Sequence, residues 1–121
     1  MKDYRELVVW QKSIQLVKEV YLLTNLLPKE ELFGLSSQLR RAAVSVPSNI
    51  AEGYGRNSRQ DYLRFLNIAR GSTYEVETQI EICIVLGYLS ADQAKSTFSL
   101  CKDTGRLLNS LISKLQLPST Q

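Results

Sequence analysis

Six arginines are concentrated in the central third of the chain, and they are the side chains best suited to bind a ligand. The 35 residues from Ser36 to Arg70 contain no lysine and only two acidic residues, Glu52 and Asp61. The whole chain has a formal net charge of +3, so the remainder is slightly acidic. A guanidinium group can donate two parallel hydrogen bonds to the oxygens of one phosphate or carboxylate, whereas an ammonium group acts as a single point charge. The arginines are Arg40, Arg41, Arg56, Arg59, Arg64 and Arg70.

Two interpretations of these arginines stay open on composition. If the helices that carry them pack antiparallel, the arginines form a basic strip on one side of the molecule that would contact the phosphates of a nucleic acid. Alternatively, they form a solvated face or pair with acidic residues of a neighbouring subunit, for which Glu75, Glu77 and Glu81 are candidates. The moderate excess of positive charge favours this second interpretation.

A smaller polar group consists of Asn49, Glu52 and Ser72. Asn49 lies on the apolar stripe of its helical segment, and Glu52 lies beside it. Polar groups that become buried need hydrogen-bond partners, which Ser72, Thr73 or Arg56 would supply. A catalytic or ligand site is the alternative, but one carboxylate and one amide are a small catalytic set. We therefore interpret the group as a structural network that fixes the register of two helices.

The chain contains no histidine, so the commonest general base and metal ligand is missing. Its two cysteines, Cys83 and Cys101, fall on apolar helical positions, which is typical of small buried residues. The segment Gly53–Gly55 lacks the lysine and hydroxyl residue of a phosphate-binding loop. We expect no metal, no cofactor and no enzymatic activity.

Apolar residues spaced three and four apart predict four helices at about residues 7–27, 30–54, 59–87 and 91–116. A short helical turn at 29–33, with Gly34 as a break, is expected before the second helix. Short connections between long helices indicate an all-α, up-down-up-down antiparallel four-helix bundle, with a single domain over residues 1–121. The apolar stripe expected for the first helix consists of Leu7, Trp10, Ile14, Val17, Tyr21 and Thr24.

Glycine, proline and serine positions predict local features of these helices. Pro47 lies inside the second helix and should kink it, while Gly53 and Gly55 should end it. Gly71, inside the third helix, suggests the close approach of another helix near that kink. Capping serines are expected before the third and fourth helices, at Ser58 and Ser90, with Gly87 as a helix terminator.

The third helix is apolar on more than one side, because Leu63, Phe65, Ile68, Ile82, Ile84 and Val85 lie outside its main stripe. A bundle helix buries one stripe, so the surplus predicts contacts between subunits of a homo-oligomer. No apolar run approaches the length of a membrane span, and the first residues do not resemble a signal peptide. We expect a cytoplasmic protein with no membrane contact.

Four segments of the sequence carry a family resemblance. The segments LVVWQK at 7–12, PKEELFGL at 28–35, QLRRAAVSVPSNIAEG at 38–53 and YLRFLNIARGS at 62–72 resemble bacterial four-helix bundle proteins encoded in intervening sequences of 23S ribosomal RNA genes. The accessory variability determinant of diversity-generating retroelements is similar to these proteins. The resemblance covers the chain from about Tyr4 to Leu115.

The resemblance implies a four-helix bundle assembled as a homopentamer without enzymatic activity. In the retroelement branch, it implies a basic surface that binds nucleic acid and a reverse transcriptase. The matching positions make the six arginines candidates for that surface. The mild net charge favours the intervening-sequence branch.

Two functional hypotheses follow. The first is a nucleic-acid-binding oligomer, with RNA preferred over DNA because of the family context, whose assembly multiplies the positive charge of each chain. The second is a protein-interaction or structural homo-oligomer whose arginines serve subunit or partner-protein contacts.

Overall fold

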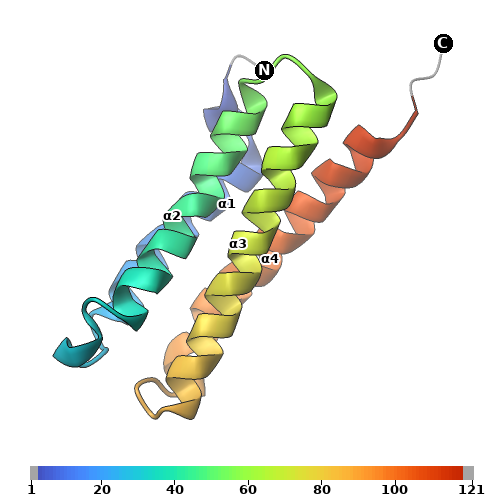
Figure 1. Ribbon diagram of the computed structural model, residues 1–121. Helices are drawn as coiled ribbons and strands as arrows, with labels where there is room; N and C mark the ends of the chain where they lie inside the picture. Colours follow the sequence, from blue (N-terminus) through green and yellow to red (C-terminus); the bar gives the residue numbers. More distant parts are fainter. Residues whose placement is uncertain (1–2, 119–121) are drawn as a thin grey trace.

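Four long helices make up most of the computed structural model, which describes residues 3–118. They are α1 (Val8–Thr24), α2 (Leu35–Tyr54), α3 (Arg59–Val85) and α4 (Ala91–Gln116), with short 3₁₀ helices η1 (Tyr4–Glu6) and η2 (Lys29–Glu31). Each long helix packs against two others in the cyclic order α1, α2, α3, α4. Successive helices run in opposite directions (Figure 1). The predicted all-α, up-down-up-down bundle is confirmed, and no strand occurs in residues 3–118.

The predicted caps of α3 and α4 are present. The Ser58 Oγ atom accepts a hydrogen bond from the Asp61 backbone N–H at 3.0 Å. Ser90 and Gln93 form a reciprocal capping box, each side chain accepting from the other's backbone N–H, at 3.0 and 2.9 Å. Such caps satisfy N–H groups that have no partner inside the helix.

Gly87 terminates α3 as predicted. Its φ of 80° lies in the left-handed region, where glycine is favoured because it lacks a Cβ atom. The Tyr88 N–H then donates to the Cys83 carbonyl at 2.9 Å, which closes a Schellman motif. The short helical turn expected at 29–33 is also present, as η2.

The end of α1 and the start of α2 differ from the predicted bounds, whereas the break at Gly34 and the end of α2 at Tyr54 are as predicted. Helix α1 ends at Thr24, because the next residues form tight turns in which Leu26 and Leu27 donate to carbonyls three residues back. Helix α2 begins only at Leu35 and continues without a break through the buried Pro47 to Tyr54. The kink at Pro47 stays a prediction.

The apolar stripe expected for the first helix was placed one residue too far along the chain. The buried face instead carries Val9, Ser13, Leu16, Val20 and Leu23, and only Thr24 of the expected stripe is fully buried with them. Of the expected stripe, Ile14 and Tyr21 are exposed, while Trp10 is half-buried. A serine in the true stripe weakens its pattern. In the structure Ser13 is satisfied inside the helix, donating to the Trp10 carbonyl at 2.6 Å.

Two glycines have roles other than those expected. Gly53 does not end α2 but lies buried within its last turn. A Cβ atom there would sit 2.8 Å from the Phe65 Cβ, so this glycine permits the close approach of α2 and α3. Gly71 is exposed, and apart from its own stretch of helix backbone no atom of the described residues lies within 4 Å of its would-be Cβ. The expected close approach at Gly71 is therefore wrong.

The core consists of two clusters of buried side chains. One gathers Leu16, Leu39 and Ile80 in the half of the bundle that holds the α1–α2 connection. The other gathers Ile50, Leu66 and Leu108 toward the α2–α3 connection. Within residues 3–118, no helix is both long and apolar enough to cross a membrane.

Candidate nucleic-acid interface

Arg56 and Arg64 meet on one aromatic ring at the α2–α3 end of the bundle. Their Cζ atoms lie 4.9 and 4.5 Å from the centre of the Phe65 ring, within cation–π distance. Phe65 is itself fixed, because its Cβ packs against Gly53. The two arginine side chains are 44% and 59% exposed, so their guanidinium groups remain open to solvent.

Acidic neighbours neutralise this pair of arginines only in part. Glu52 pairs with Arg56 at 3.1 Å, and Asp61 lies 4.0 Å from Arg64. Both pairs are solvent-exposed, where an ion pair contributes at most about 1 kcal/mol and salt weakens it. A phosphate group can therefore replace the carboxylates at low energetic cost.

Arg59 lies at the same end of the molecule, as the first residue of α3. It is exposed, and its Nη1 atom donates to the Leu117 carbonyl at 3.3 Å. Leu117 follows the last turn of α4, which reaches this end of the bundle (Figure 1). Arg56, Arg59 and Arg64, which we call the Phe65 cluster, are thus brought to one end.

Arg40 has a structural role on the opposite edge of α2. Its Cζ atom lies 4.7 Å from the centre of the Tyr21 ring. Its Nε atom donates to Thr24 Oγ1 at 2.9 Å, and its Nη2 atom donates to Asn25 Oδ1 at 3.3 Å. Arg40 therefore ties α2 to the end of α1.

Arg70 has a comparable position between α3 and α4. Its Nη1 atom donates to Asn109 Oδ1 at 3.0 Å, and its Nη2 atom donates to Asn67 Oδ1 at 2.6 Å. The α1–α2 edge that holds Arg40 and the α3–α4 edge that holds Arg70 lie across the bundle from one another. The six arginines therefore do not share one continuous strip.

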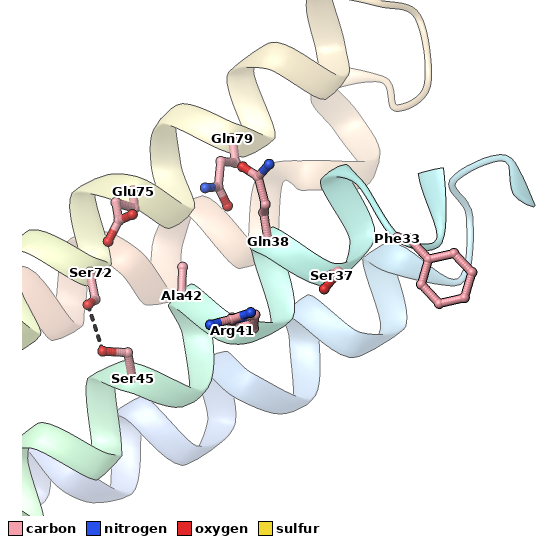
Figure 2. A pocket seen from close by; sticks show the side chains of 9 residues that line it. All are labelled: Phe33, Ser37, Gln38, Arg41, Ala42, Ser45, Ser72, Glu75 and Gln79. Carbon is pink, nitrogen blue, oxygen red and sulfur yellow. Dashed lines mark hydrogen bonds between the residues drawn. The ribbon is translucent and has the colours of Figure 1, made fainter. Parts of the chain in front are cut away.

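Arg41 faces a cleft between α2 and α3 (Figure 2). The cleft has a volume of about 370 Å³. Arg41 is exposed, and neither it nor Glu75 on the opposite wall forms a hydrogen bond or ion pair within residues 3–118. The lining residues are Phe33, Ser37, Gln38, Arg41, Ala42 and Ser45 on the α2 side and Ser72, Glu75 and Gln79 on α3.

The predicted polar network is centred on a residue that the sequence analysis missed. The Ser45 hydroxyl accepts hydrogen bonds from Asn49 Nδ2 at 2.9 Å and from the Ser72 hydroxyl at 2.9 Å. Asn49 Nδ2 also donates to the Ser45 carbonyl at 2.8 Å. Ser45 therefore links Asn49 to Ser72, whereas Glu52 pairs with Arg56 instead. The four-residue spacing of Ser45 and Asn49 on one helix was the available signal.

The cysteines are buried and free. Burial is the main cause that raises the pKa of the Cys101 thiol to about 12, and it also raises the pKa of Cys83. A thiol with a raised pKa is a poor nucleophile at neutral pH. Among the described residues, no group of three potential metal-ligating side chains comes together.

The sequence profile of a family described as 23S rRNA-intervening sequence protein matches residues 5–110. The chain belongs to this family. A protein of unknown function from the S23 ribosomal protein family of Bacteroides thetaiotaomicron VPI-5482 is similar in structure, with a TM-score of 0.80 and 30% sequence identity. The similarity covers 87% of this chain and 98% of that one. No curated protein matches the chain.

Proposed function

We propose that this member of the 23S rRNA-intervening sequence protein family is a non-enzymatic, oligomeric protein that binds nucleic acid, with RNA preferred. The observation that carries the proposal is the convergence of Arg56 and Arg64 on Phe65. Stacking on the ring orders two guanidinium groups before a ligand arrives, which lowers the entropy lost on binding. Arg59 at the same end adds a third cation.

Binding by this surface would be electrostatic and strengthened by assembly. Each chain carries a net charge of +3, and a homo-oligomer presents several copies of the Phe65 cluster. Multiple weak phosphate contacts then act together, and the affinity falls steeply with salt. The names of this family and of the similar protein's family both refer to ribosomal RNA or ribosomal proteins, which favours RNA as the first ligand to test.

A second candidate function is a protein-interaction or structural homo-oligomer, and apolar surface favours it. A groove of about 320 Å³ between α1 and α2 is lined by Trp10, Ile14, Val17 and Val44 among others. Val85 at the end of α3 is 82% exposed. Contiguous apolar surface marks interaction sites. A homopentamer, and a reverse transcriptase as partner in a retroelement context, are the assemblies to test here.

The test is fluorescence anisotropy of the purified protein with labelled RNA and duplex DNA at about 50 and 200 mM salt. We expect binding at low salt that weakens strongly at high salt. The double variant Arg56→Gln/Arg64→Gln should lose about tenfold or more in affinity, because two phosphate contacts are removed.

The matched control is Lys95→Gln/Lys102→Gln on α4, which removes the same charge far from the Phe65 cluster. A cluster variant that binds like this control would contradict the proposal. Absence of binding to either nucleic acid would leave the protein-interaction function, and light scattering after size-exclusion chromatography would then measure the assembly.

A further inference from the structure

The cleft between α2 and α3 contains polar groups that the folded chain does not satisfy. Arg41 on the α2 wall and Glu75 on the α3 wall do not pair with one another or with another described residue. The Oε1 atom of Gln79 is shielded from solvent and accepts no hydrogen bond from the described chain. Arg41 and Glu75 are exposed, so in the free protein they bind water and remain open to a ligand, whereas the buried Gln79 oxygen is an exception to the usual pairing of buried polar groups.

The α3 wall presents the exposed Glu75 carboxylate, a hydrogen-bond acceptor, to a ligand in the cleft. Glu75 and Gln79 are four residues apart, so they lie on the same face of the helix. Figure 2 shows both side chains directed into the cleft from α3. A ligand that suits this wall must present N–H donors.

The α2 wall of the cleft suits a ligand group of opposite charge. Arg41 offers a guanidinium group, which suits an anion such as phosphate. The Phe33 ring, in the turn before α2, lies at the far end of the cleft from Glu75 and is 92% exposed, an unusual position for a large apolar side chain (Figure 2). Exposed aromatic rings are the surfaces on which unpaired bases stack in complexes with single-stranded RNA.

Single-stranded RNA combines these three features. We propose that the cleft takes one of its unpaired bases, with the exposed Glu75 carboxylate accepting a hydrogen bond from an amino group of the base and Arg41 contacting its phosphate. This inference rests on the proposed function and names the form of RNA that the protein selects. Paired bases are excluded, because the major groove of an A-form duplex is too deep and narrow for side chains to reach the amino groups.

Glu75 makes the cleft selective between the two RNA pyrimidines. Cytosine carries an amino donor at C4, whereas uracil carries a carbonyl acceptor at the same place. A carboxylate accepts a hydrogen bond from the former and repels the lone pairs of the latter. Bases with an amino group therefore bind more tightly than uracil.

The experiment compares labelled oligocytidine and oligouridine of about eight nucleotides, a length within the site sizes of single-strand-binding proteins. Anisotropy is measured near neutral pH and at low salt, with the full chain. We expect the cytidine oligomer to bind about 3- to 10-fold more tightly, the effect of one hydrogen bond. Glu75→Gln should reduce this ratio to near one.

Matched variants separate contacts in the cleft from general charge effects. Glu81→Gln removes the same charge from the α3–α4 side and should keep the cytidine preference. Arg41→Ala should weaken both oligomers equally and more than Lys95→Ala does. Circular dichroism establishes that each variant is folded.

Three results would overturn the inference. Equal affinity of the wild type for both oligomers, or an unchanged cytidine preference in Glu75→Gln, would mean that the cleft does not distinguish between bases. If the Phe65 cluster variants still lost affinity in that case, the proposed function would stand without this inference. A changed oligomeric mass in Arg41→Ala or Glu75→Gln would show that the cleft is a subunit contact.

Discussion

Gly53 of α2 and Phe65 of α3 lie so close together that a Cβ atom on Gly53 would sit 2.8 Å from the Phe65 Cβ. Phe65 in turn supports the guanidinium groups of Arg56 and Arg64. A backbone contact between two helices therefore positions the arginines that we propose to bind nucleic acid. Substitution of this glycine should affect both stability and binding.

Gly53→Ala should destabilise the protein by about 1 to 3 kcal/mol, because the added methyl group forces α2 and α3 apart. The control is Gly71→Ala, which apart from its own stretch of helix backbone meets no described atom within 4 Å and should gain about 0.5 to 1 kcal/mol from helix propensity. Urea unfolding at equal protein concentrations measures both. If Gly53→Ala were as stable as the wild type, the close approach of α2 and α3 would be wrong.

Truncation to alanine should lower the folding free energy at Arg40 but leave it nearly unchanged at the adjacent Arg41. Arg40→Ala removes contacts to Tyr21, Thr24 and Asn25 and should cost about 1 kcal/mol or more of folding free energy. Arg41→Ala should stay within about 0.5 kcal/mol of the wild type, because Arg41 is exposed and no partner is found for it in residues 3–118. Thermal unfolding distinguishes the two. Equal losses would contradict the structural role of Arg40.

The buried face of a helix was predictable where the buried stripe is its strongest apolar stripe. Along α3, the buried stripe consists of Leu66, Ala69, Thr73, Val76, Ile80 and Cys83, and its one hydroxyl residue is satisfied within the helix, with Thr73 Oγ1 donating to the Ala69 carbonyl at 3.0 Å. Along α1, Ser13 interrupts the buried stripe, and a neighbouring stripe with Trp10 and Ile14 appears stronger. Periodicity identifies a helix with two apolar faces, but the packing of the other helices decides which face enters the core.

The candidate site was less predictable, because it depends on the orientation of helices rather than on spacing within one. Arg40 and Arg41 are adjacent, so the sequence shows that they point about 100° apart but not which of them faces α1. The cleft beside Arg41 forms only where α3 brings Glu75 and Gln79 opposite α2. No pattern within either helix predicts that these residues lie opposite one another.

The hydroxyl groups of Ser45 and Ser72 should be energetically coupled across the α2–α3 contact. Ser45→Ala leaves the buried Ser72 hydroxyl without its acceptor and removes one of the two hydrogen bonds of Asn49 Nδ2, and should cost about 1 to 2 kcal/mol. The double variant Ser45→Ala/Ser72→Ala should lose less than the sum of the two single losses. A double-mutant cycle by urea unfolding gives the coupling energy. Additive losses would mean that this hydrogen bond does not stabilise the fold.

Alkaline pH should destabilise the protein through Cys101. Burial raises the pKa of its thiol to about 12 in the folded state, whereas an unfolded cysteine ionises near pH 8.5 to 9. Between these values the unfolded chain releases a proton that the folded chain retains. The free energy of unfolding therefore falls with rising pH, by up to about 1.4 kcal/mol per pH unit from this group. Below about pH 8 the contribution is complete and constant.

Urea unfolding under reducing conditions at about pH 7, 8, 9 and 10 measures this slope. Cys101→Ala should be less stable at pH 7, because it loses a buried sulfur atom, but its stability should fall less steeply above pH 8.5. Part of the slope should remain, because burial also raises the pKa of Cys83 in the same direction. Parallel pH profiles for the wild type and Cys101→Ala would show that this thiol is not shielded from solvent in the folded protein.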